Sequence, residues 1–172
     1  MGRSGYSDCD DYDTEDQYLI NLHAGALASA LRGRRGQAFL QRLAAALDSM
    51  PAKSLCKIQS GDEVDGVRDP VTRVWTYPPG TDRLGLPDGQ VCVLGSLAKA
   101  EGMDPVAIDA TEHKTLAKLF NVSEILVREL EWENDQRYSV GPDGETEGEA
   151  RWRHLREWVV AHTVKPVATE PA

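Results

Sequence analysis

Apolar residues recur at steps of three and four along the first third of the chain, which is the spacing of one face of an α-helix. This pattern predicts two amphipathic helices, over residues 17–32 and 37–50. Gly33 can end the first helix, and Pro51 ends the second because proline cannot continue a helix. We expect the two to form a helical hairpin joined by RGRRG. The stripes consist of Leu19, Leu22, His23, Ala26, Leu27, Ala30 and Leu31, then Phe39, Leu40, Leu43, Ala46 and Leu47.

Alternating apolar residues predict short strands at 54–60 (SLCKIQS) and 90–94 (QVCVL). A third strand-like run, VTRVWTY, lies in the Gly-, Pro- and Asp-rich stretch between them. We expect a small antiparallel β element here, and we interpret the region of about 60–89 as a loop or β insertion. In this interpretation Cys92 is a small core residue on one face of a strand.

The second half of the chain is predicted to be helical. Ser96 and Thr111 are candidate N-caps, and EARWRHLREWVVAHTV places its apolar residues three or four apart. The predicted fold class is mainly α, with five or six helices, a helix-turn-helix-like pair and a small antiparallel β element. We expect an acidic, solvated N-terminal arm at 1–16, a single helical domain at 17–163 and a tail at 164–172.

Residues 115–135, TLAKLFNVSEILVRELEWEND, have the spacing of a helix-turn-helix motif. Asn121 holds the turn position, where asparagine tolerates a left-handed backbone. Ala117 supplies the small residue wanted where the helices cross, and Ser123 can cap the second helix. The remaining core positions are Leu116, Phe120, Val122, Val127 and Leu130.

The charge of the chain argues against a DNA-reading role for this motif. The chain carries 28 acidic and 19 basic residues, for a net charge of −9. Residues 128–149 contain eight acids and two bases. A recognition helix lies between two walls of phosphate and is normally flanked by Lys or Arg. We therefore expect duplex DNA not to be the partner.

The outer face of the second helix is predicted to bind a protein instead. Core spacing accounts for Val127 and Leu130, so we expect Glu124, Glu129 and Trp132 to point away from the core. Carboxylates at helical spacing can imitate the charge pattern of a duplex, and Trp is enriched in interface hot spots. The alternative is an ordinary solvated face. The predicted partner-binding residues are Glu124, Arg128, Glu129, Trp132 and Glu133.

Three arginines, Arg32, Arg34 and Arg35, lie among two glycines in an otherwise acidic chain. One interpretation is structural: arginines at the end of a helix favour its negative pole, or they pair with the acidic N-terminal arm. The other is functional, because exposed guanidinium groups bind carboxylates and phosphates. Both interpretations stay open at this point, and the three arginines join the predicted partner-binding residues.

No catalytic, metal or cofactor site is predicted. The order Cys92, His113, then Asn134 or Asp135 is conceivable for a cysteine-dependent hydrolase, but Cys92 is expected inside a strand. No apolar run reaches the ~20 residues of a membrane span, and we expect a cytoplasmic protein. The three cysteines, Cys9, Cys56 and Cys92, are widely spaced and form no C-x-x-C pair. Together with the small number of histidines, this spacing argues against a zinc site.

The segments MGRSGYSD, RGRRGQAFL and VCVLGSLAKAEGMD, followed by LEWEND and RWRHLREWV, resemble an uncharacterised family of small proteins from proteobacterial phages and prophages. The likeness covers most of the chain and fails over 61–87. VCVLGSL with the later END is also similar to a broader bacterial domain of unknown function, with the pattern Cys-Ala-Leu-Gly-Ala-Leu and then Trp-Asn-Asp. The resemblance implies a phage context and a family role for Cys92, Asn134 and Asp135, and it implies no chemistry.

These observations favour a non-catalytic phage or prophage accessory protein that binds a host protein or complex. Its acidic surface and the phage context make inhibition of a nucleic-acid-binding defence complex, such as a CRISPR effector, the expected role. A helix-turn-helix regulator of phage genes is the first alternative, and a cysteine-dependent hydrolase is the second. The sequence leaves open the partner's identity and whether the chain forms a homo-oligomer.

Overall fold

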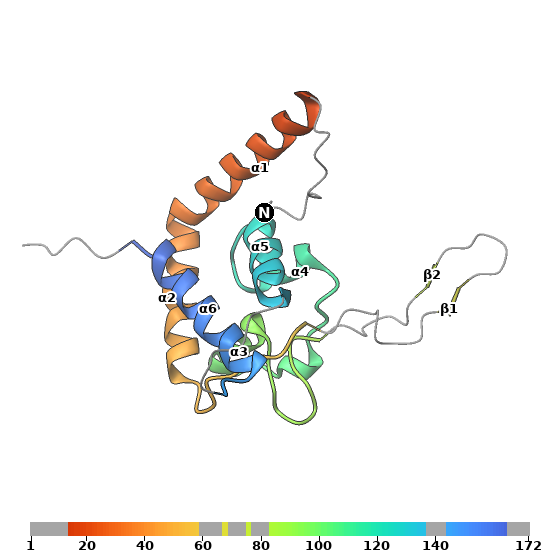
Figure 1. The fold of residues 1–172 in the computed structure, drawn as a ribbon, viewed down its shortest axis with the longest axis vertical. Coiled ribbons are helices and arrows are strands. Elements are labelled where there is room, and N and C mark those ends of the chain that lie inside the picture. The colour runs from red at the N-terminus through yellow and green to blue at the C-terminus, as the bar shows by residue number, and fades with distance from the viewer. Residues whose placement is uncertain (1–13, 59–66, 69–74, 77–82, 137–143, 165–172) are drawn as a thin grey trace, which may run out of the picture.

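The computed structural model describes residues 14–58, 67–68, 75–76, 83–136 and 144–164. The described part is mainly helical, as predicted (Figure 1). Most of the expected N-terminal arm, insertion and tail lie outside the described residues. The six α-helices are α1 (Thr14–Arg32), α2 (Arg34–Ser49), α3 (Val93–Ala100), α4 (His113–Leu119), α5 (Glu124–Asp135) and α6 (Glu147–His162), and a 3-10 turn, η2, spans Pro105–Ala107.

The first two helices meet at an elbow, and the expected hairpin is wrong. A single residue separates them: Gly33 is extended, with φ −66° and ψ 150°, and its N–H donates to the Ser29 carbonyl at 2.9 Å. α1 consequently leaves α2 at an angle, and its N-terminal part extends away from the other helices (Figure 1). Gly36 explains how close the junction is, because a Cβ there would lie 1.9 Å from the Ala30 carbonyl oxygen.

The core lies where α2, α3, α5 and α6 pack against one another. Each helix contributes a stripe of fully buried side chains, and the Phe39 ring meets the Phe120 ring edge to face, with centroids 6.3 Å apart. Burying one such side chain stabilises the fold by about 1.5–3 kcal/mol. The principal members are Leu40, Leu43 and Leu47 of α2, Leu94 and Leu97 of α3, Leu126, Val127 and Leu130 of α5, and Leu155 and Val159 of α6.

The expected strands at 54–60 and 90–94 do not form a sheet. The Cys56 N–H does donate to the Val91 carbonyl at 3.0 Å, but α3 begins at Val93 with Cys92 as its N-cap. The predicted N-cap at Ser96 is therefore also wrong. The named strands are two residues each, β1 (Val67–Arg68) and β2 (Trp75–Thr76), paired antiparallel.

The reason is tertiary packing. A short apolar run fits a buried strand or a buried helix equally well. Here the run is helical from Val93 onward, and the first turn of α3 packs on the chain at Leu84 so closely that a Cβ on Gly95 would lie 1.9 Å from the Leu84 carbonyl oxygen. The last helix follows its prediction more closely, since Leu155, Trp158 and Val159 are buried and a Thr146–Glu149 capping box starts it.

Candidate functional surfaces and a buried polar network

α4 and α5 are two helices joined by a short turn at the predicted place. Asn121 adopts the left-handed conformation, with φ 53°. The Val122 N–H donates to the Ala117 carbonyl at 2.9 Å and closes the end of α4. Ser123 occupies the N-cap position of α5, but its side chain accepts no capping hydrogen bond, contrary to the prediction. The six predicted core residues of the motif are all buried: Leu116, Ala117, Phe120, Val122, Val127 and Leu130.

The outer face of α5 carries less exposed acid than predicted. Glu129 is 4% exposed and Glu133 is 3% exposed, so the expectation that these two side chains point to solvent is wrong. The physical reason is that α5 packs against α1, α3, α4 and α6, and not against a single neighbour. Glu133 is paired with His154 of α6 at 2.6 Å.

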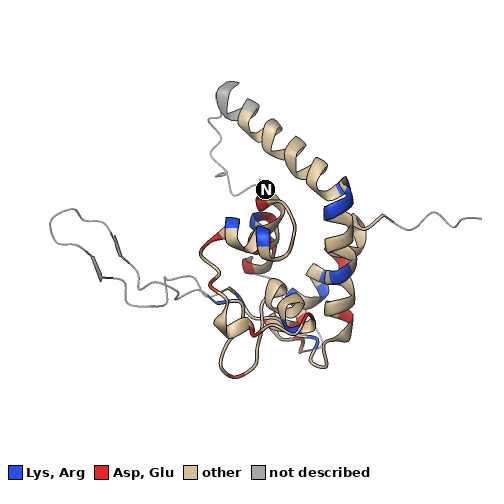
Figure 2. Cartoon of the chain, turned by 180° about the vertical axis from the view of Figure 1, so that it is seen from behind, with Lys and Arg blue, Asp and Glu red and all other residues tan. Residues whose placement is uncertain are grey.

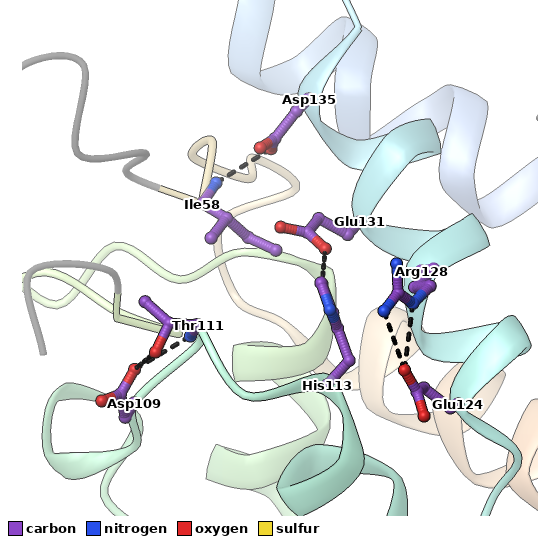
Figure 3. Close-up of polar contacts among 8 residues, drawn as sticks. All are labelled: Ile58, Asp109, Thr111, His113, Glu124, Arg128, Glu131 and Asp135. Carbon is purple, nitrogen blue, oxygen red and sulfur yellow. Dashed lines mark hydrogen bonds and ion pairs between the residues drawn. The ribbon is translucent and has the colours of Figure 1, made fainter. Parts of the chain in front are cut away.

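Three of the predicted partner-binding residues of α5 keep access to solvent. Arg128 is exposed, while Glu124 and Trp132 are half-buried. The Arg128 guanidinium donates to Glu124 Oε1 at 2.8 Å, an i,i+4 pair on the surface of the helix (Figure 3). Glu131 is paired with His113 of α4 (Figure 3). The Arg128 cation on this face of α5 is thus already paired with a carboxylate of the same helix. Partner binding by Glu124, Arg128 and Trp132 stays a prediction.

The arginine joint, which we define as Arg32, Arg34 and Arg35, is exposed at the elbow between α1 and α2. Figure 2 shows this junction as basic, below a long uncharged stretch of α1. Arg32 donates to the Ala28 carbonyl at 3.2 Å. Within the described residues, neither Arg34 nor Arg35 forms an ion pair with an acidic side chain.

Helix electrostatics explain only part of the arginine joint. Arg32 lies in the last turn of α1, where a cation favours the negative end of the helix dipole. Arg34 and Arg35 lie in the first turn of α2, which holds no acidic residue. A cation at that end is disfavoured by about 0.3–1 kcal/mol, offset in part by the neighbouring end of α1. The fold therefore gains little from these two arginines.

Cys92, Asn134 and Asp135, the residues singled out by the family resemblance, do lie together. The Asn134 side chain is fully buried. Its Oδ1 accepts from the Val93 N–H at 3.0 Å, and its Nδ2 donates to the Cys56 carbonyl at 3.1 Å. Asp135 Oδ1 accepts from the Ile58 N–H at 2.9 Å (Figure 3). One end of α5 thereby fastens both the segment at 55–58 and the start of α3.

Arg151 of α6 completes the buried network. Its Nε donates to the Asn134 carbonyl at 2.6 Å and its Nη1 to the Leu55 carbonyl at 2.9 Å. Its Nη2 donates to Glu147 at 2.8 Å. The network therefore satisfies backbone groups from three segments that are distant in sequence, which is what buried polar atoms require. Sequence reasoning gave Arg151 no role; its only signal was an arginine on the apolar side of an amphipathic helix.

The environment of the thiols argues against cysteine catalysis. Burial raises the pKa of the Cys56 thiol to about 11, and burial raises that of the fully buried Cys92 thiol further. Cys92 Sγ accepts from the Gly95 N–H at 3.4 Å as the cap of α3. A cysteine nucleophile reacts as the thiolate, which this setting disfavours. Burial likewise raises the pKa of Asp135.

A cavity of about 490 Å³ lies between the end of α2 and α3, and the sequence gave no sign of it. Its volume is that of small-molecule sites. The Ser96 hydroxyl in its wall donates to the Val93 carbonyl at 2.7 Å, and Asp88 accepts from Gln90 at 2.8 Å. Several of its polar groups are therefore already bonded within the chain.

No group of three or more His, Cys, Asp or Glu side chains in the described part of the chain could hold a metal ion. Within the same residues, no helix combines the length and the apolar character needed to cross a membrane. Comparisons of the chain with protein-family models, with curated proteins and with solved structures found no match.

Proposed function

We propose that this protein is a non-catalytic accessory protein that binds a host protein through the arginine joint. The observation that carries the proposal is the exposed pair Arg34 and Arg35, which has no acidic partner among the described residues and lies at the wrong end of α2 for helix stability. Guanidinium groups held open in this way are suited to carboxylates on another surface.

A protein partner fits better than nucleic acid. Three arginines can neutralise only a few phosphates, while the net charge of −9 repels a polyanion. A protein with a local acidic patch experiences much less repulsion. The burial of Glu129 and Glu133 leaves less acid on α5 to imitate a duplex, so the arginine joint replaces that face as the centre of the contact. The phage resemblance makes a host defence complex, such as a CRISPR effector, the class of target that we propose.

A helix-turn-helix regulator of phage genes is the second candidate, and two helices joined by a left-handed turn at Asn121 support it. In such a regulator the exposed cations of α4 and α5 would contact phosphates. They are Lys114, Lys118 and Arg128.

Two matched variants separate the candidates. The first, Arg32→Gln with Arg34→Gln and Arg35→Gln, removes the arginine joint. The second, Lys114→Gln with Lys118→Gln and Arg128→Gln, removes the same amount of charge from the helix-turn-helix. The full chain and both variants are used to capture partners from host lysate, with and without nuclease treatment, and captured partners are then identified and measured in purified form.

The proposal expects one protein partner that survives nuclease treatment. Its association should slow by about tenfold or more in the first variant and stay unchanged in the second, because rim charges steer association. Raised salt should reproduce the first variant's effect. A nuclease-sensitive partner that is lost only in the second variant would establish the regulator. A protein partner bound equally by both variants would show that the arginine joint is not the contact.

A further inference from the structure

The side of α1 that faces away from the body carries a stripe of exposed, uncharged residues. Leu19 is 49% exposed and Leu22 is 52% exposed, and both Ala26 and Ser29 are exposed. We call these four residues the outer stripe of α1. They are spaced three, four and three apart, the core pattern of two packed helices. The opposite side, with Leu27 and Leu31, packs on the body and accounts for the fold.

The local sequence suits contact with another helix. Residues 18–31 contain no Asp, Glu, Lys or Arg, and Figure 2 shows a long uncharged stretch of α1 that projects from the molecule. Gly25 lies in the middle of this stretch, and a Cβ built there would meet nothing within 4 Å. A glycine inside a helix costs about 1 kcal/mol relative to alanine. The monomer gives no steric reason for it, whereas close approach of a second helix does.

We propose that the outer stripe of α1 binds the outer stripe of a second copy, with the two helices antiparallel. The stripe is self-complementary in volume only in that direction. An antiparallel pair centred on Ala24 places Leu19 against Ser29 of the second copy and Leu22 against Ala26 of the second copy. Each large side chain then meets a small one, as close packing requires. A parallel pair would put leucine against leucine and serine against serine.

Charge favours the same arrangement. α1 carries Arg32 in its last turn. Parallel pairing would bring the Arg32 side chains of the two copies together, while antiparallel pairing keeps them at opposite ends of the contact. Two copies, each with a net charge of −9, repel one another, so an uncharged stripe is where they can meet at least cost. Arg34 and Arg35 of α2 remain available for the contact proposed above.

The contact is short, so the dimer is weak. Stable interfaces bury about 1,200–2,000 Å², more than four residues of one helix can supply, and we expect dissociation on the order of tens of micromolar. Sedimentation equilibrium of the full chain, from well below to well above that concentration, should show a reversible monomer–dimer equilibrium.

Variants of the stripe test the register. Leu22→Glu places a carboxylate in the seam and should leave a monomer at every concentration. Val160→Glu is the matched control, because Val160 of α6 is 48% exposed and lies on another helix; it should dimerise like the parent. Ala26→Leu places leucine against leucine and should weaken the dimer about tenfold. Combining it with Leu22→Ala exchanges the large and small positions and should restore association.

Several results would overturn this proposal. One is a parent chain that stays monomeric throughout; another is a dimer that Leu22→Glu leaves intact. A dimer strengthened by Ala26→Leu would show parallel helices and reject the antiparallel register. Circular dichroism of each variant establishes that the fold is retained. Since the stripe is exposed, these changes should alter the free energy of unfolding by only about 0.5 kcal/mol.

Discussion

The Asn134→Ala substitution tests whether the buried network, and not only the apolar core, holds this fold together. Asn134 is fully buried, and its amide pairs with two backbone groups that lie far from it in sequence, the Val93 N–H and the Cys56 carbonyl. Alanine removes both partners without giving water access to either group. A buried polar group left unpaired costs about 1–3 kcal/mol, so the two together should cost about 2–6 kcal/mol. That is a large part of the roughly 5–15 kcal/mol that stabilises a typical domain.

Urea unfolding followed by tryptophan fluorescence measures this loss directly. Gln136→Ala is the matched control: Gln136 also carries an amide near the end of α5, but its hydrogen bond to Glu133 is 3.5 Å long and only half-buried. We expect that control to fall within about 0.5 kcal/mol of the parent. Asp135→Asn keeps an acceptor for the Ile58 N–H, so its loss of unfolding free energy should lie between those of Asn134→Ala and Gln136→Ala. A loss below about 1 kcal/mol for Asn134→Ala would refute the reasoning, because it would mean that the network stabilises nothing.

Three further predictions use the same unfolding assay. Glu133→Lys should destabilise the protein by about 3 kcal/mol or more, because it puts a cation beside His154 in a buried site. The control Glu124→Lys should cost less than about 1 kcal/mol. Equal costs for the two variants would contradict the burial of Glu133. Gly36→Ala should destabilise by about 2 kcal/mol or more through its clash with the Ala30 carbonyl, and Ala38→Ser, exposed on the same helix, should be neutral. Because burial raises the pKa of Asp135, the folded state binds its proton more tightly than the unfolded state. The stability advantage of the parent over Asp135→Asn should therefore be greatest below about pH 4 and shrink as the pH rises through the raised pKa; an advantage that grows with pH would reverse the sign.

The arginine joint shows how structure can separate two interpretations that a sequence leaves open. In the sequence, Arg32, Arg34 and Arg35 form one basic run, and a helix dipole could account for all three. The structure assigns them to two different helices, with Arg32 at the favourable end of α1 and the other two at the unfavourable end of α2. For α5 the structure instead removes candidate binding residues, because Glu129 and Glu133, which the sequence predicts on the surface, are buried.

The sequence by itself determined the helices whose apolar residues recur over several turns. The stripe of α2, the α4–α5 pair with Asn121 at its turn, and the buried residues of α6 all follow from local periodicity and turn preferences, because one continuous apolar side must be buried wherever the helix packs. These features depend on residues within about ten positions of one another, so the local spacing of apolar and turn residues is enough to predict them.

Tertiary structure decided everything that depends on how many neighbours a helix has. A single apolar stripe accounts for one packed side, yet α5 contacts four other helices, and the charged residues between its stripes became buried. The run VCVLGSL is helical only from Val93 onward, where the first turn of α3 packs on the chain at Leu84. Asn134 reaches the Cys56 carbonyl across 78 positions of sequence, and no local pattern reports such a contact. Burial depends on every helix that packs against a residue, whereas the spacing of apolar residues in the sequence identifies only one packed face of a helix.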